Sequence, residues 1–299
     1  MRALSINPVY NPTVHEVTRV GGFTNTTLLN LTMPEWDAEM YARYRPTYPP
    51  SLYQSIIAHG GPEFATDLAI DIGCGTGQVT ASLAERFTNV IGIDASESQV
   101  SAAAKRPNIK YVIGSAEATG LDGSCADLVT AAAALHWFDS HVFFSEARRI
   151  LKPNGVLAAW SYSSVPQFPG NTVQAETVYL KMRDVLWPYF DPRLHKAINE
   201  GYAHFVPEAK KVFDESTIQE IVMDWPISVE GLVGWVRSWS PYLAYCRAQG
   251  DEEGESLLNT YRDDMKEALG VKAVTEPVTV RLRLQVVLAR GFAGKKGIL

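Results

Sequence analysis

Three glycines stand at alternate positions in residues 68–77, LAIDIGCGTG, directly after a short apolar run. Glycine permits positive φ and lets a ligand touch the backbone, and a helix that begins there offers free N–H groups. Val79, Leu83 and Phe87 recur every fourth residue and predict that helix. The pattern therefore predicts a strand, a ligand-binding turn and a helix, an arrangement typical of nucleotide-cofactor sites.

The identity of the ligand follows from the residues around the turn. Asp94 closes the next apolar run, residues 89–93, where a carboxylate can accept both ribose hydroxyls of an adenosine. A dinucleotide fingerprint counted from Gly73 requires glycine at position 78, where the chain has Gln78. Asp71 at the mouth of the turn would repel a pyrophosphate but would suit a cationic amino group. A ligand with an adenosine end and a positively charged amino acid end is S-adenosylmethionine.

The elements that must position these residues alternate along the first half of the chain. We expect strands at residues 68–72, 89–93, 111–113, 127–131 and 156–160, with helices between them and one before them at residues 49–60. Such alternation predicts a parallel, doubly wound sheet with its ligand site at the carboxyl ends of the strands. Residues 278–288 alternate as a long strand does, and residues 221–225 are its candidate neighbour.

The chain resembles the class I S-adenosylmethionine-dependent methyltransferases. The segments that carry the resemblance are IDIGCGTG (70–77), IGIDAS (91–96), VIGSAEATGL (112–121), ADLVTAAAALHWFD (126–139) and RILKPNGVLAAW (149–160). Within that superfamily it is similar to the trans-aconitate methyltransferase-related group of fungal type, through YARYRPTYP (41–49), ALHWFD (134–139) and SWSPY (238–242). The resemblance implies an α/β, Rossmann-like sheet of seven strands in the order 3-2-1-4-5-7-6, with strand 7 antiparallel, helices on both faces and a helical insertion covering the substrate.

The resemblance also implies which residues bind the cofactor. Those expected at the methionine moiety are Asp71, Gly73, Cys74, Gly75, Thr76 and Gly77, and those expected at the ribose and adenine are Asp94, Ala95, Ser115 and Ala116. Ala132 would offer its carbonyl to the cofactor amino group. Many relatives carry Asp where Ser115 stands, so the adenine amine can be bound by Glu117 instead. Tyr41 and Arg45 belong to a stretch that folds over the cofactor in relatives, where Arg45 could pair with the methionine carboxylate or form a surface salt bridge.

Candidate acceptor residues follow the fourth strand and lie in the second half of the chain. His136 and Trp137 stand where a transferred methyl group would emerge, so His136 is either a catalytic group or a structural histidine. Trp235, Trp239 and Tyr242 could wall the acceptor pocket, although their spacing is also that of a helix core. No acidic cluster suggests a metal.

Composition bounds the remaining choices. The net charge is −6, which gives no basic surface for nucleic acid. Residues 161–275 hold 11 Lys/Arg and 17 Asp/Glu, so the acidic excess lies there. Three separated cysteines and the absence of a long apolar run favour a cytoplasmic protein without a membrane segment.

We therefore expect a single methyltransferase domain over residues 1–299. It comprises an N-terminal cover (1–48), a cofactor-binding core (49–160), a substrate-cover insertion (161–275) and a final strand with a tail (276–299). The favoured reaction forms a methyl ester on a small carboxylic acid. Two alternatives stay open, namely methylation of a hydroxyl or amine in secondary metabolism and cofactor-dependent chemistry without methyl transfer. Gln78 and Asp71 disfavour an oxidoreductase.

Overall fold

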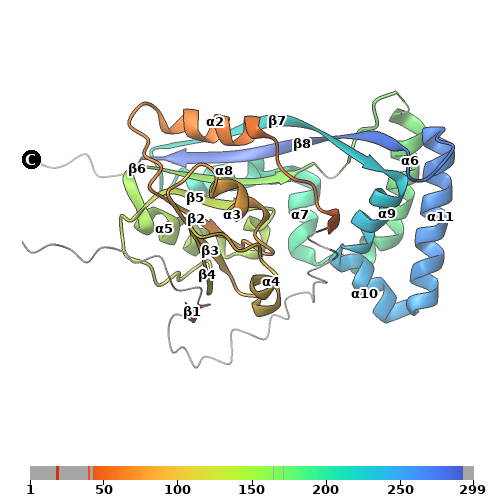
Figure 1. Ribbon diagram of the computed structural model, residues 1–299, viewed down its shortest axis with the longest axis horizontal. Helices are drawn as coiled ribbons and strands as arrows, with labels where there is room; N and C mark the ends of the chain where they lie inside the picture. Colours follow the sequence, from red (N-terminus) through yellow and green to blue (C-terminus); the bar gives the residue numbers. More distant parts are fainter. Residues whose placement is uncertain (1–17, 20–39, 41–42, 164, 171, 292–299) are drawn as a thin grey trace, which may run out of the picture.

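The computed structural model describes residues 18–19, 40, 43–163, 165–170 and 172–291. In this part of the chain one sheet runs in the order β1-β4-β3-β2-β5-β6-β8-β7 (Figure 1). The strands are β1 (Thr18–Arg19), β2 (Leu68–Ile72), β3 (Asn89–Asp94), β4 (Ile109–Ile113), β5 (Ala126–Ala132), β6 (Leu151–Tyr162), β7 (Glu215–Ser228) and β8 (Pro277–Arg290). β8 is antiparallel to both its neighbours, and the other pairs are parallel.

Without β1 this is the expected seven-stranded order 3-2-1-4-5-7-6, so the predicted fold is confirmed. The two-residue strand β1, which pairs with β4, is an addition that the sequence did not predict. The predicted pairing near the C-terminus is also confirmed, because Ile221 of β7 lies opposite Leu284 of β8.

Alternate residues of the strands build two separate cores, one on each face of the sheet. Ala69 and Leu128 pack with α2 (Pro50–Gly60) and α3 (Gln78–Leu83). Ile70 and Val129 pack on the opposite face with α5 (Ser140–Ile150) and with the segment formed by η3 (Gly201–Phe205) and α8 (Val206–Ala209). Helices on both faces explain why the strands read as apolar runs and not as alternating patterns.

The helix after the glycine turn is shorter than its apolar pattern suggests. α3 ends at Leu83, and the backbone N–H groups of Arg86 and Phe87 then donate to the Leu83 carbonyl in a tight turn. Phe87 remains buried although it lies outside the helix. The chain must reverse here because β3 begins at Asn89. The polar helix that follows is α4 (Glu97–Ser101), whose cap is the Ser96 hydroxyl.

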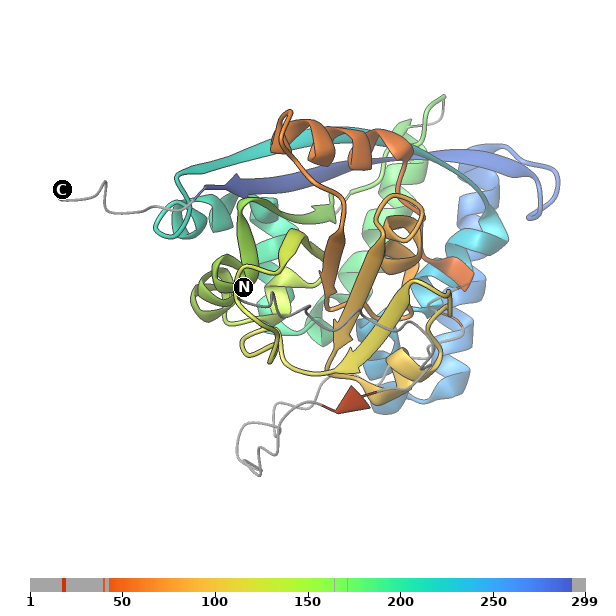
Figure 2. The ribbon, with the colours of Figure 1, turned by 60° about the vertical axis from the view of Figure 1, so that its left-hand side comes forward.

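Most of the second half of the chain is helical and gathers beside the sheet. The elements are α6 (Thr172–Leu186), η2 (Trp187–Tyr189), α7 (Pro192–Glu200), α9 (Val229–Arg237), α10 (Ser240–Gln249) and α11 (Asp251–Leu269). β7 and β8 extend past the parallel strands, and α6, α9, α10 and α11 cluster at their far end (Figure 1). From the second direction α2 is seen lying alongside these long strands (Figure 2). Within the ranges described above, no helix has both the length and the apolar character that crossing a membrane requires.

A buried carboxylate joins the start of β5 to the start of β2. Asp127 Oδ2 accepts the backbone N–H groups of Asp67 and Leu68, each at 2.9 Å. Its Oδ1 lies 2.8 Å from Nζ of Lys152, and its side chain is 4 % exposed. The three donors are satisfied by one side chain, so the register between β2 and β5 depends on Asp127.

We expect Asp127→Ala to lower the free energy of unfolding by about 2–4 kcal/mol, because it leaves two backbone N–H groups without their acceptor and leaves Lys152 paired only with the exposed Asp67. Urea denaturation monitored by circular dichroism measures the change. Asp122→Ala, which removes an exposed carboxylate from the preceding loop, is the matched control and should change stability by less than about 0.5 kcal/mol. Equal effects of the two substitutions would contradict the role given to Asp127.

Candidate functional site

The glycine turn joins β2 to α3 and is tightly enclosed by side chains. Gly73 and Gly77 have φ values of 69° and 79°, which lie in the left-handed region. A Cβ at Gly73 would meet Ala134, and a Cβ at Gly77 would meet the Tyr111 hydroxyl. Glycine is therefore required at both positions by conformation and by space. Cys74 is a buried packing residue of the same turn, and burial raises the pKa of its thiol.

Asp71 lies beneath this turn and is 1 % exposed. Its carboxylate accepts the hydroxyl of Thr80 at 2.6 Å and that of Thr130 at 2.8 Å. Burial raises the pKa of Asp71 to about 6, although both threonine hydroxyls oppose the rise. The structure thus places Asp71 as a link between β2, α3 and β5 and not at the surface of the turn.

Asp94 ends β3 beside the glycine turn. One carboxylate oxygen accepts the Gly75 N–H and the other accepts the Ser96 N–H, both at 2.8 Å. Burial raises the pKa of Asp94 against these backbone donors. The Thr76 hydroxyl and the Gln99 amide oxygen are also buried at this turn without a hydrogen-bond partner in the described part of the chain. These unsatisfied polar atoms fit a polar ligand lying along the turn.

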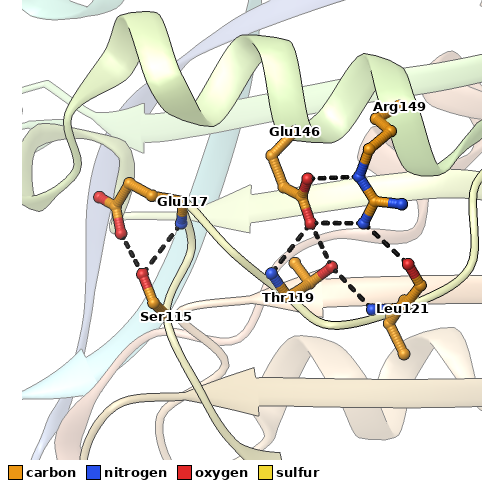
Figure 3. A network of polar contacts seen from close by, with 6 residues as sticks. All are labelled: Ser115, Glu117, Thr119, Leu121, Glu146 and Arg149. Atoms are coloured by element: carbon orange, nitrogen blue, oxygen red, sulfur yellow. Dashed lines mark hydrogen bonds and ion pairs between the residues drawn. The ribbon is translucent and has the colours of Figure 1, made fainter. Parts of the chain in front are cut away.

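Ser115, Ala116 and Glu117 follow β4 and form the next side of the site. The Ser115 hydroxyl donates to the Glu117 carboxylate (Figure 3). The other carboxylate oxygen of Glu117 accepts the Asp139 N–H at 3.0 Å. Both oxygens of Glu117 are therefore engaged within the protein, while Ser115 and Ala95 are exposed at the edge of the site.

The loop that carries these residues is anchored to α5 by Glu146 (Figure 3). Glu146 accepts the N–H of Thr119 at 2.9 Å and its hydroxyl at 2.5 Å. Arg149 binds the same carboxylate and donates to the Leu121 carbonyl at 2.7 Å. Burial raises the pKa of Glu146, but the hydrogen bonds from Arg149 and Thr119 outweigh it and lower the pKa to about 2. The loop is thus held by an ionised carboxylate throughout the neutral range.

A cavity of about 130 Å³ opens beyond the end of β5. Its lining residues are Arg45, Ala133, His136, Trp137, Ser161, Tyr162, Ser163, Tyr179, Arg183, Phe190, Leu194, Ala197, Ile198, Trp235, Trp239, Ser240 and Pro241. The volume is close to that of the ~150 Å³ cavities that hold benzene-sized molecules. This space suits a small molecule.

Arg45 reaches the cavity wall and holds two other elements. It donates to the Tyr162 hydroxyl at 2.6 Å, and to the hydroxyl and the carbonyl of Ser238, each at 3.1 Å. Arg183 enters from α6, where its Nε is buried without a hydrogen-bond partner among the described residues. Its guanidinium is otherwise paired with Asp184 and stacked over Trp187.

The backbone is strained directly after β5, at the cavity wall. Ala133, directly after β5, has a φ of 49°, which is rare for a residue with a Cβ. Its N–H donates to the Trp160 carbonyl of β6 at 2.7 Å, which holds the conformation. The strain turns the chain from Ala132 at the sheet edge into η1 (Leu135–Trp137), which presents His136 and Trp137 to the cavity.

His136 is held from behind by a phenol. Its Nδ1 lies 2.8 Å from the Tyr202 hydroxyl. The pKa of His136 is lowered to about 3, mainly by burial and also by the charges of Arg193 and Arg45, while Asp191 opposes the shift. His136 is therefore neutral at physiological pH.

The remaining predicted site residues fall into those that line the cavity and those that do not. Trp235 and Trp239 line the cavity, as does Arg45, whereas Tyr41 lies outside the described residues. The structure does not bring Tyr242 to the cavity; it is buried against Gly254 of α11. The helical spacing that suggested it is interrupted, because α9 ends at Arg237 and α10 begins at Ser240.

Three polar residues of the cavity region escaped the sequence reasoning. Tyr162 is the last residue of β6, and ligand sites at the carboxyl ends of strands were a signal that could have identified it. Arg183 and Tyr202 come from the irregular second half, and no motif marked them.

Comparison with known proteins decides the family. Residues 70–159 match the model of a methyltransferase domain. The chain is 34 % identical to a methyltransferase of Dictyostelium discoideum over 75 % of this chain and 84 % of that protein. It is 30 % identical to the trans-aconitate 2-methyltransferase of Acidovorax sp. (strain JS42), over 75 % of this chain and 91 % of that protein.

The chain belongs to the class I S-adenosylmethionine-dependent methyltransferases. A solved structure of a type II methyltransferase from Anaeromyxobacter dehalogenans is 28 % identical, covers 83 % of this chain and 98 % of its own, and superimposes with a TM-score of 0.65. S-Adenosylmethionine is the cofactor of this methyltransferase. The Asp94 carboxylate accepts two backbone N–H groups but is not fully buried, and the Thr76 hydroxyl and the Gln99 amide oxygen lack hydrogen-bond partners among the described residues. These polar groups at the turn fit that cofactor.

The buried Asp71 makes the stability of the methyltransferase depend on pH. Its pKa is higher in the folded than in the unfolded chain, so the folded state binds the proton more tightly and stability falls as pH rises from about 4 to about 6. We expect Asp71→Asn to remove this loss, which amounts to about 3 kcal/mol at neutral pH. Urea denaturation of both proteins at pH 4 and pH 7 measures it. A constant difference between the two proteins across this range would contradict the assignment.

Proposed function

We propose that this methyltransferase transfers the methyl group of S-adenosylmethionine to a carboxylate oxygen of a small acid bound in the cavity, forming a methyl ester. The observation that carries the proposal is the charge of the cavity wall. The lining includes Arg45 and Arg183 and no Asp or Glu. A guanidinium pairs with a carboxylate through charge-assisted, often bidentate hydrogen bonds.

The overall acidity of the chain does not oppose an anionic acceptor. Residues 161–275 hold 17 Asp and Glu residues, and none of them lines the cavity. Several pair with arginines elsewhere, as Glu255 does with Arg237 and Asp224 with Arg281. The acidic excess is therefore spread over the outer surface and the ion pairs, while the cavity itself is cationic.

The proposed cofactor contacts lie at the carboxyl ends of β2, β3, β4 and β5, next to the cavity. The glycine turn would hold the methionine moiety, Asp94 the ribose, residues 115–117 the adenine, and Ala132 the amino group. Ala133 adjoins Ala132 and already belongs to the cavity wall. The reacting methyl group would thus face the acceptor at this junction.

The chemical work of the protein in such a reaction is positioning. The bound cofactor supplies an electrophilic methyl group on a sulfonium. Arg183 would hold the acid so that one oxygen points at that methyl group, and the aromatic walls would exclude water from the reacting atoms. A carboxylate is ionised at neutral pH, so the reaction needs no general base. No described group of three or more His, Cys, Asp or Glu side chains is arranged to hold a metal ion.

The Acidovorax relative supports this choice of substrate class, because its name gives trans-aconitate, an acid, as its acceptor. A direct test incubates the purified enzyme and cofactor with a panel of small mono-, di- and tricarboxylic acids, phenols and amines. Mass spectrometry then detects products heavier by one methylene unit. Methyl esters are the expected products; methylation confined to phenols or amines would contradict the proposal.

Loss of the carboxylate at Asp94 is expected to weaken cofactor binding. Asp94→Asn removes a charge-assisted acceptor for the ribose hydroxyls, so the Kd for S-adenosylhomocysteine should rise roughly 10-fold to 100-fold. Isothermal titration calorimetry measures it. Asp122→Asn, which changes an exposed carboxylate far from the turn, should leave the Kd unchanged. Unchanged affinity in the Asp94 variant would show that the ribose is bound elsewhere.

Arg183 is expected to determine affinity for the acid. Arg183→Met should raise KM for the acid roughly 10-fold to 100-fold, because a charge-assisted pair is lost. Cofactor affinity should not change. Lys181→Met removes the same charge from an exposed position on the same helix and should leave KM within about twofold. If both variants raise KM equally, the effect comes from overall charge and not from the cavity.

A further inference from the structure

His136 lies between the acceptor cavity and a buried phenol. It is half-buried and lines the cavity. On the inner side its Nδ1 lies 2.8 Å from the hydroxyl of Tyr202, which is 0 % exposed. An imidazole that uses Nδ1 for this contact has Nε2 left on the other side of the ring. The proton position on His136 therefore decides what the ring can do toward an acceptor.

The surroundings of the phenol decide which partner donates. Tyr202 contacts the start of η1, where the first backbone N–H groups have no acceptor inside the helix. Burial raises the pKa of Tyr202, whereas the backbone N–H groups of His136 and Leu135 and the hydroxyl of Ser161 lower it, so these three groups lie close to the phenol oxygen. The geometry gives the buried phenol hydroxyl a hydrogen bond to Nδ1 of His136, and a buried O–H group is satisfied only when it donates. Nδ1 therefore accepts from Tyr202, and Nε2 carries the ring proton.

Tyr202 is itself fixed by the sheet. Its backbone N–H donates to the side-chain oxygen of Gln285, in β8, at 2.7 Å. The preceding residue, Gly201, has a φ of 65°, and a Cβ there would collide with the same Gln285 amide. Phe205 packs edge-on against the Tyr202 ring at 5.2 Å. The phenol thus has one position, which β8 and η3 impose.

We propose that Tyr202 is a positioning residue that fixes His136 as the Nε2–H tautomer, so that His136 donates a hydrogen bond into the cavity and does not act as a base. The mechanistic consequence rests on the proposed function. A neutral donor at this place stabilises an acceptor that is already ionised, such as a carboxylate. It cannot deprotonate a hydroxyl or an ammonium group, so the Tyr202–His136 pair selects for acids.

Burial keeps His136 neutral, and the charged groups around it add to this effect on balance. Arg193 and Asp191 face it from α7 and its cap, His204 faces it from η3, and Arg45 faces it from the cavity wall. The cations prevail over the single carboxylate. Between pH 5 and 8 the ring therefore does not titrate, and the rate should show no step from a histidine in that range.

The tautomer can be measured without any acceptor. Long-range 1H–15N correlation spectra of the histidine-labelled protein, with His136→Gln used to assign the signal, report which ring nitrogen carries the proton. We expect a single Nε2–H form in the wild type and a mixture in Tyr202→Phe. Tyr261→Phe removes another buried phenol hydroxyl, away from His136, and should leave the spectrum unchanged. An Nδ1–H or imidazolium signal in the wild type at pH 7 would overturn the proposal.

Two substitutions of His136 distinguish the roles of its ring nitrogens Nδ1 and Nε2 in the catalysed reaction. The side chain of Gln can place its N–H group near the position of Nε2, whereas that of Asn reaches only to the position of Nδ1. We expect kcat/KM for the best acid to fall less than about 10-fold in His136→Gln and roughly 10-fold to 100-fold in His136→Asn. Both pH profiles should stay flat between pH 5 and 8. A larger loss in the Gln variant, or a wild-type step near pH 6.5, would contradict the proposal. If no acid is methylated but the Nε2–H form is seen, the proposed function fails while the tautomer assignment stands.

Discussion

The hydrogen bonds between the buried Asp71 carboxylate and the hydroxyls of Thr80 and Thr130 are the interaction on which the site depends. They tie β2, α3 and β5 together directly beneath the glycine turn. The glycine turn, where we propose that the cofactor binds, and the strand end that leads to the cavity are therefore held by the same carboxylate. Burial of this charge costs stability, as the raised pKa of Asp71 shows, and two short hydrogen bonds offset only part of that cost. The fold thus retains an unfavourable group where precise positioning is needed.

The two halves of the site come from two parts of the sheet. The parallel strands β2 to β5 end in the turn, in Asp94 and in residues 115–117, all of which face the cofactor in our proposal. The antiparallel pair β7 and β8 extends beyond them and carries the helices whose side chains wall the cavity. Through Gln285 and Tyr202 this extension also reaches His136, which links the acceptor side to the end of β5. The cavity wall carries Arg45 and Arg183 and no carboxylate, although the net charge of the chain is −6, so the charge proposed to bind an acid is separate from the charge that covers the surface.

Local chemistry made the parallel part of the sheet and its glycine turn predictable. The glycine spacing, Asp94 and the apolar runs each act within a few residues, so the sequence shows them directly, and the strand order followed from the resemblance. The acceptor half was less accessible because its residues meet only through tertiary packing. Arg183 and Tyr202 lie in segments without a motif, and their roles depend on how α6 and η3 dock. Tyr242 was predicted as a possible cavity residue from a helical spacing, but it does not line the cavity, because that spacing spans the break between α9 and α10. The sequence indicated Arg45 as a site residue, but it did not indicate the hydrogen-bond partners of Arg45, which are Tyr162 and Ser238.

The central claim is that the cofactor turn and the cationic cavity form one methyl-transfer site. A crystal structure of the methyltransferase with S-adenosylhomocysteine and a small dicarboxylic acid tests this most directly. We expect the ribose at Asp94, the sulfur at the mouth of the cavity beside Ala133, and an acid carboxylate paired with Arg183 and pointing at the sulfur. A sulfur turned away from the cavity, or an acid bound outside it, would show that the turn and the cavity do not form one site.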